Sequence, residues 1–331
     1  MKRCCILLLI LCFLLGGCAP AAQKQYNAVY LDLFDTVTTI IGSGDSEEQF
    51  RQETQIIYQQ MLVYHRLFDI YNDYEGIANL KTVNDQAGIA PVKVDSAIIE
   101  LLLDCKEYYE LTDGKVNAAM GSVLKLWHDA RNHGMENPDD AKLPDADALV
   151  QAAEHISFKS IVIDETASTV YISDPETSLD VGAIAKGWAA QRVAENAPKG
   201  MLISVGGNVC ATGAKADGSA WVVGVQNPDG GEYLRKIPIT DGAVVTSGDY
   251  QRTYTVDGKQ YHHIIDPATG MPSTYWRSVT MVCADSALAD ALSTALFLLP
   301  LEEGKALAEE CGAEVLWLDA QGEQYSTEDF Q

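Results

Sequence analysis

The sequence predicts an α+β protein in which mixed or antiparallel sheets carry flanking helices. Two long amphipathic segments come early, at residues 47–71 and 96–111, and most segments with the character of strands follow residue 160. This segregation favours an α+β fold over a doubly wound sheet, in which strands and helices alternate. With 47% hydrophobic and 21% charged residues, the composition is globular, which excludes a disordered chain.

The first half of the chain is predicted to hold one strand and two helices. Residues 29–41 are rich in β-branched and aromatic residues and are predicted to form a strand. Residues 47–71 place apolar side chains three and four positions apart, which predicts a helix with one buried face. Residues 96–111 show a second such pattern, and Asp113-Gly114 ends it. Residues 135–147 are polar and contain proline, so they are predicted to form a loop.

Strands dominate the second half. They are predicted at 161–164, 169–172, 201–205, 221–226, 244–246, 261–266, 279–284 and 314–318, with helices at 183–196, 285–299 and 302–311. The chain shows no internal repeat, low-complexity segment or clear linker. We therefore expect one folded domain over residues 28–331.

The charge balance excludes one class of partner. The 331 residues include 23 basic and 47 acidic side chains, a formal net charge of −24 with a sequence pI near 4.4. Nucleic acid is excluded as a partner because such a chain repels phosphates. An anionic ligand would need a cation or aligned backbone amides to be held here.

The N-terminus has the pattern of a targeting segment. Lys2 and Arg3 precede an apolar run at 6–15, which is too short to cross a bilayer of about 30 Å and is typical of a secretory signal. The Leu-Gly-Gly-Cys sequence that ends at Cys18 resembles the bacterial lipobox. We predict a lipoprotein signal peptide at 1–17, a lipidated tether at 18–27 and Cys18 as the lipidation site. The alternative is an ordinary signal peptide in which Cys18 is incidental.

A lipid anchor would place the protein on the extracytoplasmic face of the bacterial cell membrane. An acidic body gains nothing from anionic lipids, so the acyl chains must supply the attachment. Four cysteines remain in the mature chain, Cys105, Cys210, Cys283 and Cys311, and they form no CxxC or Cys/His metal spacing. We expect buried free thiols. The alternative is one or two disulfide bonds, which can form outside the cytosol.

The stretch LDVGAIAKGWA at 179–189 is a turn of small residues that leads into a helix. Gly182 and Ala183 let a ligand approach the backbone closely. The helix N-terminus supplies unpaired amides, and Lys186 adds a full positive charge, so a diphosphate is one candidate ligand. The alternative is a plain turn with Lys186 in solvent.

A second candidate site lies in the predicted helix at 285–299. Asp290 and Thr294 are four residues apart, so they share a helix face whose neighbours are alanine and leucine. A lone buried carboxylate is costly unless it is paired or binds a metal. Carboxylate and hydroxyl oxygens suit Mg²⁺. The alternatives, a cap or a pair with Lys or Arg, carry equal weight.

Two histidines and a tyrosine complete the candidates. His262 and His263 are adjacent on a predicted strand, so at most one of them faces a given pocket. For His262 we favour a structural hydrogen bond to Asp266, and His263 is left open as a general base. Tyr71 is a candidate to stack on a planar ring, although an aromatic residue at a helix end is more often part of the core.

Together these stretches resemble the family of FAD:protein FMN transferases, the ApbE-like flavin transferases. Five motifs occur in the order and spacing of that family: LDVGAIAKGWA (179–189), SVGGNVCATG (204–213), VVTSGDY (244–250), HHIIDPATG (262–270) and ADALSTALF (289–297). The resemblance spans nearly the whole mature chain and implies an ApbE-like, T-fold-related architecture.

The resemblance also implies an activity and a site. Such enzymes bind FAD with Mg²⁺, cleave its diphosphate, pass FMN to a Ser or Thr hydroxyl of a partner protein and release AMP. The implied metal ligands are the Ala183 carbonyl, Asp290 and Thr294, and the implied base for the acceptor hydroxyl is His263. The implied FAD site comprises Tyr71, Ala118, Ala119, Met120, Asp180, Lys186, His263 and Ile264. The acceptor would be an exported or membrane flavoprotein.

Two departures from the family pattern affect this expectation. Val116-Asn117 stands where many members have Phe-Asp, and Phe34-Asp35 replaces a commoner Met-Gly. Two other functions stay open: an FAD diphosphatase, which would release FMN and AMP with water as nucleophile, and an FAD-binding lipoprotein without catalysis.

Overall fold

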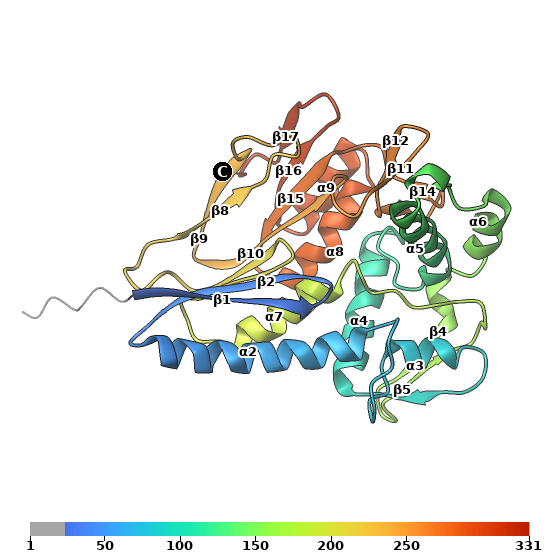
Figure 1. The fold of residues 1–331 in the computed structure, drawn as a ribbon, viewed down its shortest axis with the longest axis horizontal. Helices are drawn as coiled ribbons and strands as arrows, with labels where there is room; N and C mark the ends of the chain where they lie inside the picture. Colours follow the sequence, from blue (N-terminus) through green and yellow to red (C-terminus); the bar gives the residue numbers. More distant parts are fainter. Residues whose placement is uncertain (1–23, 331) are drawn as a thin grey trace, which may run out of the picture.

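The centre of the computed structural model, which describes residues 24–330, is an eight-stranded antiparallel sheet (Figure 1). The strands, in their spatial order, are β1 (Lys24–Leu33), β2 (Thr36–Gly44), β6 (Leu202–Val205), β7 (Asn208–Thr212), β10 (Asp241–Gly248), β15 (Ser278–Cys283), β16 (Glu314–Leu318) and β17 (Gln324–Ser326). Strands from both ends of the chain meet in this sheet. The predicted α+β class is confirmed.

Helices pack on one face of this sheet. They are α2 (Glu47–Phe68), α4 (Ser96–Leu111), α7 (Ala185–Asn196), α8 (Ser286–Phe297) and α9 (Leu301–Glu310). Val245 of β10 faces this helical core, whereas the adjacent Val244 faces the hairpin of β8 (Trp221–Val225) and β9 (Arg235–Ile239) on the other side. This alternation follows from the period of two along a strand.

A smaller group of elements adjoins the sheet. Trp127, Leu149 and Tyr254 join α5 (Gly121–Glu136) and α6 (Ala146–Ala153) to the hairpin of β11 (Tyr254–Val256) and β12 (Lys259–Tyr261). The remaining elements are α3 (Leu80–Asp85), β3 (Val92–Lys93), η1 (Pro138–Asp140), η2 (Phe158–Ser160), β4 (Ile161–Asp164), β5 (Thr169–Ile172), β13 (Ile265–Asp266) and β14 (Met271–Pro272).

The strand predicted at 29–41 is a hairpin. β1 and β2 pair with Val29 opposite Thr39, and the chain reverses at Phe34 and Asp35, whose φ angles are 53° and 52°. A tight hairpin turn needs such positive φ values, which usually call for Gly or Asn. Because neither residue occurs at this turn, the sequence showed no break. Residues 24–27, assigned to the tether, belong to β1, so the fold includes residues before 28.

Two helix predictions also need correction. α2 ends at Phe68 and not at residue 71, because the side chain of Asp69 accepts a hydrogen bond from the backbone N–H of Tyr71 and turns the chain. α5 was not predicted, and it extends to Glu136, into the segment 135–147 that we expected to be a loop. The loop prediction holds for 137–145, which contains only a short 3₁₀ turn.

The four cysteines within residues 24–330 are free thiols. Cys105 and Cys210 are buried, and Cys283 and Cys311 are half-buried. Burial raises the pKa of all four. The predicted signal peptide and Cys18 lie outside the described residues. Within residues 24–330, no helix is both long enough and apolar enough to cross a membrane.

The contact between α7 and α8 depends on one glycine. A Cβ atom placed on Gly187 would lie 2.3 Å from the carbonyl oxygen of Ser286 and 2.4 Å from the Cβ of Asp290. Both distances are far below van der Waals contact. Gly187 therefore lets the two helices approach closely enough for their side chains to form a common site.

We predict that Gly187→Ala destabilises the protein. Alanine favours a helix by about 1 kcal/mol over glycine, but separating two packed helices costs typically 1–3 kcal/mol or more. Chemical unfolding monitored by circular dichroism measures the net effect. Gly304→Ala in α9 is the control, because the nearest atom to its Cβ would be 3.3 Å away, on the Trp317 ring. Equal stability of the two variants would contradict the close contact.

Candidate active site

Two backbone segments lie side by side at the start of the site. The backbone N–H of Asp180 donates to the Ala118 carbonyl at 2.8 Å, and that of Gly121 donates to the Ser178 carbonyl at 2.9 Å. The Asn84 side chain fixes the segment at 178–180, because it donates to the Leu179 carbonyl and accepts from the Leu179 N–H. The predicted segment Ala118, Ala119 and Met120 is thus adjacent to Asp180, and all three of its side chains are buried.

Asn117 supports this segment. Its side chain accepts a hydrogen bond from the Ala119 N–H at 2.9 Å and donates to the Ile156 carbonyl at 2.8 Å. An aspartate at this position accepts hydrogen bonds but donates none when ionised. The departure from the family pattern therefore adds a hydrogen bond that ties the segment to residue 156.

The turn at 180–184 carries the predicted lysine. Asp180 accepts a hydrogen bond from the Gly182 N–H, and Lys186 Nζ reaches the Gly182 carbonyl at 3.2 Å. The same ammonium lies 3.4 Å from Asp290 Oδ2. Lys186 thus joins the turn to α8, and the alternative of a solvated lysine is wrong.

Asp290 is almost completely buried, at 4% exposure, and is paired. Its Oδ2 atom accepts from the Gly187 N–H at 2.8 Å and pairs with Lys186, as the ion-pair alternative expected. Thr294, one turn along α8, donates to the Asp290 carbonyl at 3.4 Å. Asp290 Oδ1 has no hydrogen-bond partner within residues 24–330.

The residues present fit a magnesium site with few protein ligands. Among the described residues, no three His, Cys, Asp or Glu side chains gather to hold a metal. The candidate set instead consists of one carboxylate with an unpaired oxygen, one hydroxyl and the Ala183 carbonyl, which lies in the turn that Lys186 links to Asp290. Mg²⁺ commonly takes one or two carboxylates and completes its shell with water and substrate phosphates.

The two histidines have different surroundings. His262 Nε2 lies 2.8 Å from the Ser273 carbonyl, and His262 Nδ1 accepts from the Ile264 N–H. Its ring also packs edge-on against Phe297. The structural role that we favoured for His262 is confirmed, but its partner is Ser273 and not Asp266.

His263 lies among cations. Its Nδ1 atom is 3.2 Å from the Gln251 carbonyl. Burial, followed by the charges of Arg252, His262, Lys186 and Arg131, lowers the pKa of His263 to about 3. The ring is therefore neutral at physiological pH. The Nδ1–H group donates a hydrogen bond to the Gln251 carbonyl. The lone pair of Nε2 is therefore free to accept a proton.

The alternative interpretation, in which Tyr71 is part of the core, is wrong. Its side chain is 57% exposed, and its hydroxyl lies 2.7 Å from His128 Nδ1 on α5. Desolvation lowers the pKa of the half-buried His128, so its ring is neutral at physiological pH.

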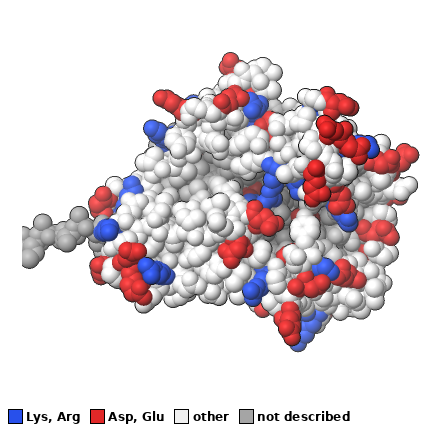
Figure 2. All heavy atoms as spheres, in the orientation of Figure 1, with Lys and Arg blue, Asp and Glu red and all other residues white. Residues whose placement is uncertain are grey.

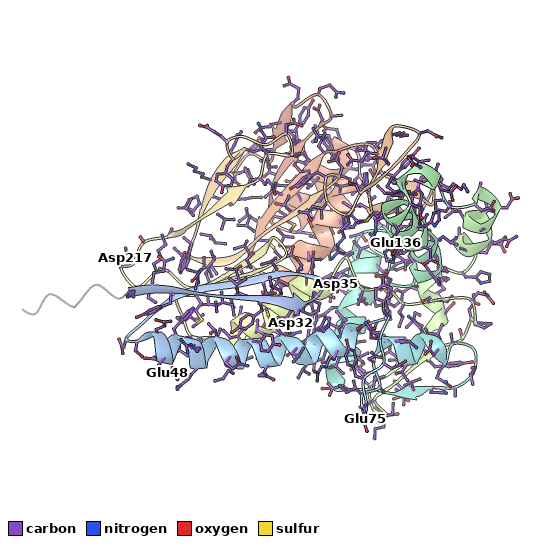
Figure 3. All side chains as sticks on the ribbon, in the orientation of Figure 1. Asp32, Asp35, Glu48, Glu75, Glu136 and Asp217 are labelled. Carbon is purple, nitrogen blue, oxygen red and sulfur yellow. The ribbon has the colours of Figure 1, made fainter. Side chains whose placement is uncertain are left out.

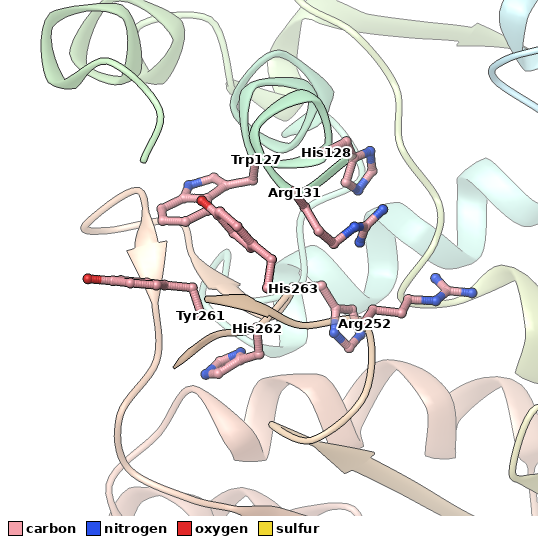
Figure 4. Close-up of a pocket in the computed structure, with 8 residues that line it drawn as sticks. Trp127, His128, Arg131, Arg252, Tyr261, His262 and His263 are labelled. Carbon is pink, nitrogen blue, oxygen red and sulfur yellow. The ribbon is translucent and has the colours of Figure 1, made fainter. Parts of the chain in front are cut away.

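A small pocket opens beside His263 (Figure 4). It is lined by Trp127, His128, Arg131, Arg252, Tyr254, Tyr261, His262 and His263. The cavity measures about 10 Å³, room for roughly one water molecule, so it is not itself a flavin cavity.

Sequence reasoning missed three of these polar residues, His128, Arg131 and Arg252. His128 and Arg131 are three residues apart on α5, so they share a face, but that helix was not predicted. Arg252 follows the motif at 244–250 and has no spacing signal of its own.

The charges on the surface are distributed unevenly. Exposed carboxylates lie on separate elements, such as Asp32 and Asp35 on the first hairpin, Glu48 on α2 and Glu136 on α5 (Figure 3). Basic side chains lie beside the hollow near the centre of the face in Figure 2. Acidic groups are thus spread over this face, and some basic side chains lie beside its central hollow.

The sheet and the site define the class of protein: an α+β fold that brings a Lys–Asp pair and a neutral histidine together. The chain belongs to the ApbE family, whose model matches residues 33–317. It is similar to a FAD:protein FMN transferase of Treponema pallidum (strain Nichols), with 32% identity over 326 residues, 92% of this chain and 87% of that protein. A FAD:protein FMN transferase of Klebsiella pneumoniae (strain 342) is 33% identical over 72% of this chain and 76% of its own length.

Solved structures agree with this assignment. The crystal structure of the ApbE protein from Thermotoga maritima has a TM-score of 0.81 and 29% identity, and the match covers 92% of this chain and 97% of that one. The flavin transferase ApbE from Vibrio cholerae has a TM-score of 0.75 at 24% identity, covers 93% and 98% of the two chains, and supports the fold. The ApbE-like architecture predicted from the motifs is confirmed.

We predict that His262→Ala destabilises the protein more than His263→Ala does. The first change leaves the Ser273 carbonyl and the Ile264 N–H without their partner, at about 1–3 kcal/mol for each unsatisfied group. The second removes one bond to the carbonyl of the exposed residue Gln251. Urea unfolding of both variants measures the difference, and equal losses would contradict the structural role of His262.

Proposed function

We propose that this chain is an Mg²⁺-dependent FAD:protein FMN transferase, which passes the FMN part of FAD to a Ser or Thr hydroxyl of an acceptor flavoprotein and releases AMP. The observation that carries the proposal is that three distant motifs supply one site. Lys186 and Asp290 pair directly, and the charge of Lys186 reaches His263.

The acidic protein binds the diphosphate of FAD through its local cations and amides. Lys186 Nζ contacts the Gly182 carbonyl of the turn at 180–184, and α7 begins with backbone N–H groups that carry partial positive charge. Asp290, Thr294 and the Ala183 carbonyl would hold Mg²⁺, which when bound neutralises charge on the diphosphate. The exposed Tyr71 is placed to stack on a planar ring of the substrate.

His263 receives the proton of the acceptor hydroxyl. Its Nδ1–H is held by the Gln251 carbonyl, and Nε2 is the basic atom. The acceptor oxygen forms a bond to the phosphorus of the FMN half as the bond from that phosphorus to the AMP oxygen breaks. The proton moves to Nε2, and AMP carries away the bonding electron pair. Positioning and charge stabilisation account for most of the catalysis in such a transfer.

Two other functions make different predictions. An FAD diphosphatase would release free FMN and AMP without an acceptor. An FAD-binding lipoprotein would bind FAD and form no AMP. Family membership favours the transferase over both.

The direct test is mass spectrometry of exported proteins that are co-expressed with this chain. We expect an added FMN mass on a Ser or Thr of an acceptor, together with one AMP for each FMN. Free FMN in the absence of an acceptor would indicate the diphosphatase. FAD binding without AMP, across several acceptors, would refute both catalytic functions.

We predict that Asp290→Asn abolishes Mg²⁺-dependent transfer. Loss of the only carboxylate in the candidate metal set should lower kcat by about 100-fold or more, because a bound metal supplies several kcal/mol of charge stabilisation. Transfer is assayed against Mg²⁺ concentration. Asp85→Asn is the control, since its carboxylate pairs with Lys81 on α3. An unchanged Mg²⁺ dependence would remove Asp290 from the metal site.

We predict that FAD binding raises the pKa of His263. In the free protein, burial and neighbouring cations hold it near 3, and a diphosphate nearby favours the imidazolium. Transfer should therefore decline as pH falls through the raised pKa, because a protonated ring accepts no proton. NMR titration of the ring, with and without FAD, measures the shift, and His263→Ala should lose the acidic limb of the kcat profile. An identical pKa in both states would contradict this mechanism.

We further propose that the protein is lipid-anchored through Cys18 on the extracytoplasmic face of the cell membrane. The N-terminal pattern supports this placement, since a lipobox-like sequence follows directly on the apolar run. The acceptor would then be an exported or membrane flavoprotein within reach of the anchored enzyme.

We predict that Cys18→Ser moves the protein into the soluble fraction. The acyl chains would be lost, and an acidic body has no electrostatic affinity for anionic lipids. Fractionation followed by immunoblotting measures the distribution. Cys105→Ser, at a buried free thiol, serves as the control. Continued membrane association of Cys18→Ser would refute the anchor.

A further inference from the structure

Arg131 and Arg252 are two cations without partners beside His263. Arg131 lies on α5 and Arg252 in the loop before β11, and both line the same pocket. Their side chains extend toward the same side of the His263 ring (Figure 4). Neither guanidinium has a hydrogen bond or ion pair within residues 24–330. Arg131 is half-buried and Arg252 is exposed, so both guanidinium groups are accessible to a ligand.

The backbone at Arg252 is strained. Its φ angle is 47°, in the left-handed region that residues other than Gly, Asn and Asp rarely adopt. Such a conformation costs of order 1–3 kcal/mol and persists only where the surroundings enforce it. The turn at 249–252 enforces this backbone conformation and directs the Arg252 side chain to the pocket (Figure 4).

The charges around the pair leave both guanidinium groups without an ion-pair partner. Burial, followed by the charge of Arg252, lowers the pKa of Arg131. Lys186 adds a third cation near His263. Three carboxylates are also near: Asp180 acts on Arg131, Asp35 on Tyr71 and Asp129 on His128. Within residues 24–330 none of them forms an ion pair with either arginine, so both guanidinium groups are available to an anion.

We propose that Arg131 and Arg252 bind the diphosphate of FAD, an inference that rests on the proposed function. A guanidinium presents a rigid fork of donors that matches two phosphate oxygens. Both arginines lie close enough to His263 to affect it, and the reacting phosphoryl group must also lie within reach of that base. Together with Lys186 they supply three positive charges to the diphosphate.

The competing interpretation is that the arginines bind an acidic side chain of the acceptor protein. The position of the arginines beside His263 agrees with both interpretations, because the acceptor hydroxyl and the diphosphate must both reach this base. Three cations around one centre favour the diphosphate, which carries about two negative charges, over a single carboxylate.

The test measures equilibrium binding of three probes, FAD, ADP and riboflavin, to the full chain and its variants. Arg131→Gln and Arg252→Asn remove the charges, and asparagine tolerates the positive φ at 252. Arg131→Lys and Arg252→Lys keep the charge but lose the fork. Arg235→Gln on β9, far from α5 (Figure 1), is the matched control. Thermal unfolding checks that each variant is folded.

We expect Arg131→Gln and Arg252→Asn each to raise the Kd of FAD and of ADP by roughly tenfold or more. The affinity for riboflavin, which has no phosphate, should stay unchanged, and the lysine variants should show intermediate values. Thermal stability should not fall, because neither guanidinium has an internal partner.

Two results would overturn the inference. One is an equal loss of affinity for riboflavin and FAD, which would show a general effect on the site. The other is unchanged binding of FAD and ADP with a raised KM for the acceptor protein, which would assign the arginines to the acceptor. Because the probes need no turnover, the inference can be tested even if the wild-type chain transfers no FMN.

Discussion

The close contact between α7 and α8 is the constraint on which the site depends. Gly187 has no side chain, so α8 approaches the first turn of α7 until Asp290 accepts a hydrogen bond from the Gly187 N–H. That bond satisfies one of the free amides at a helix start and keeps a buried carboxylate in place. Lys186, one residue earlier, completes the pair. A single glycine thus determines where the only carboxylate of the candidate metal set lies.

Around this contact the protein separates its charges. Acidic side chains lie on many separate elements, whereas Lys186, Arg131 and Arg252 all act on His263. Local cations act strongly where burial reduces screening by water, so a very negative protein can still attract a dinucleotide. Burial, together with these cations, keeps His263 neutral before the substrate binds. The bound diphosphate would then supply the negative charge that makes the ring a better base.

Backbone hydrogen bonds between distant segments hold the remaining site residues. Asn84 clamps Leu179, and the carbonyl of Ala118 receives the Asp180 N–H. Asn117, where the family pattern commonly has aspartate, gains a donor that reaches Ile156. The residues that these contacts join are 39 to 95 positions apart in the chain. Spacing along the sequence therefore does not reveal the contacts.

Hydrophobic periodicity and ordered motifs were enough to predict the α+β class and the helices α2, α4, α7, α8 and α9, and they nominated Lys186, Asp290, Thr294 and His263 as candidate site residues. These features depend on local pattern, because a buried helix face repeats every three to four residues and a motif is contiguous. The tertiary structure alone decided the rest. It turned 29–41 into a hairpin through positive φ at Phe34 and Asp35, paired His262 with Ser273, and brought Arg131 from α5 to Arg252. The physical reason is that packing between distant segments sets these three features: a turn without glycine, the hydrogen-bond partner of a side chain, and the approach of two arginines. No local sequence pattern encodes such packing.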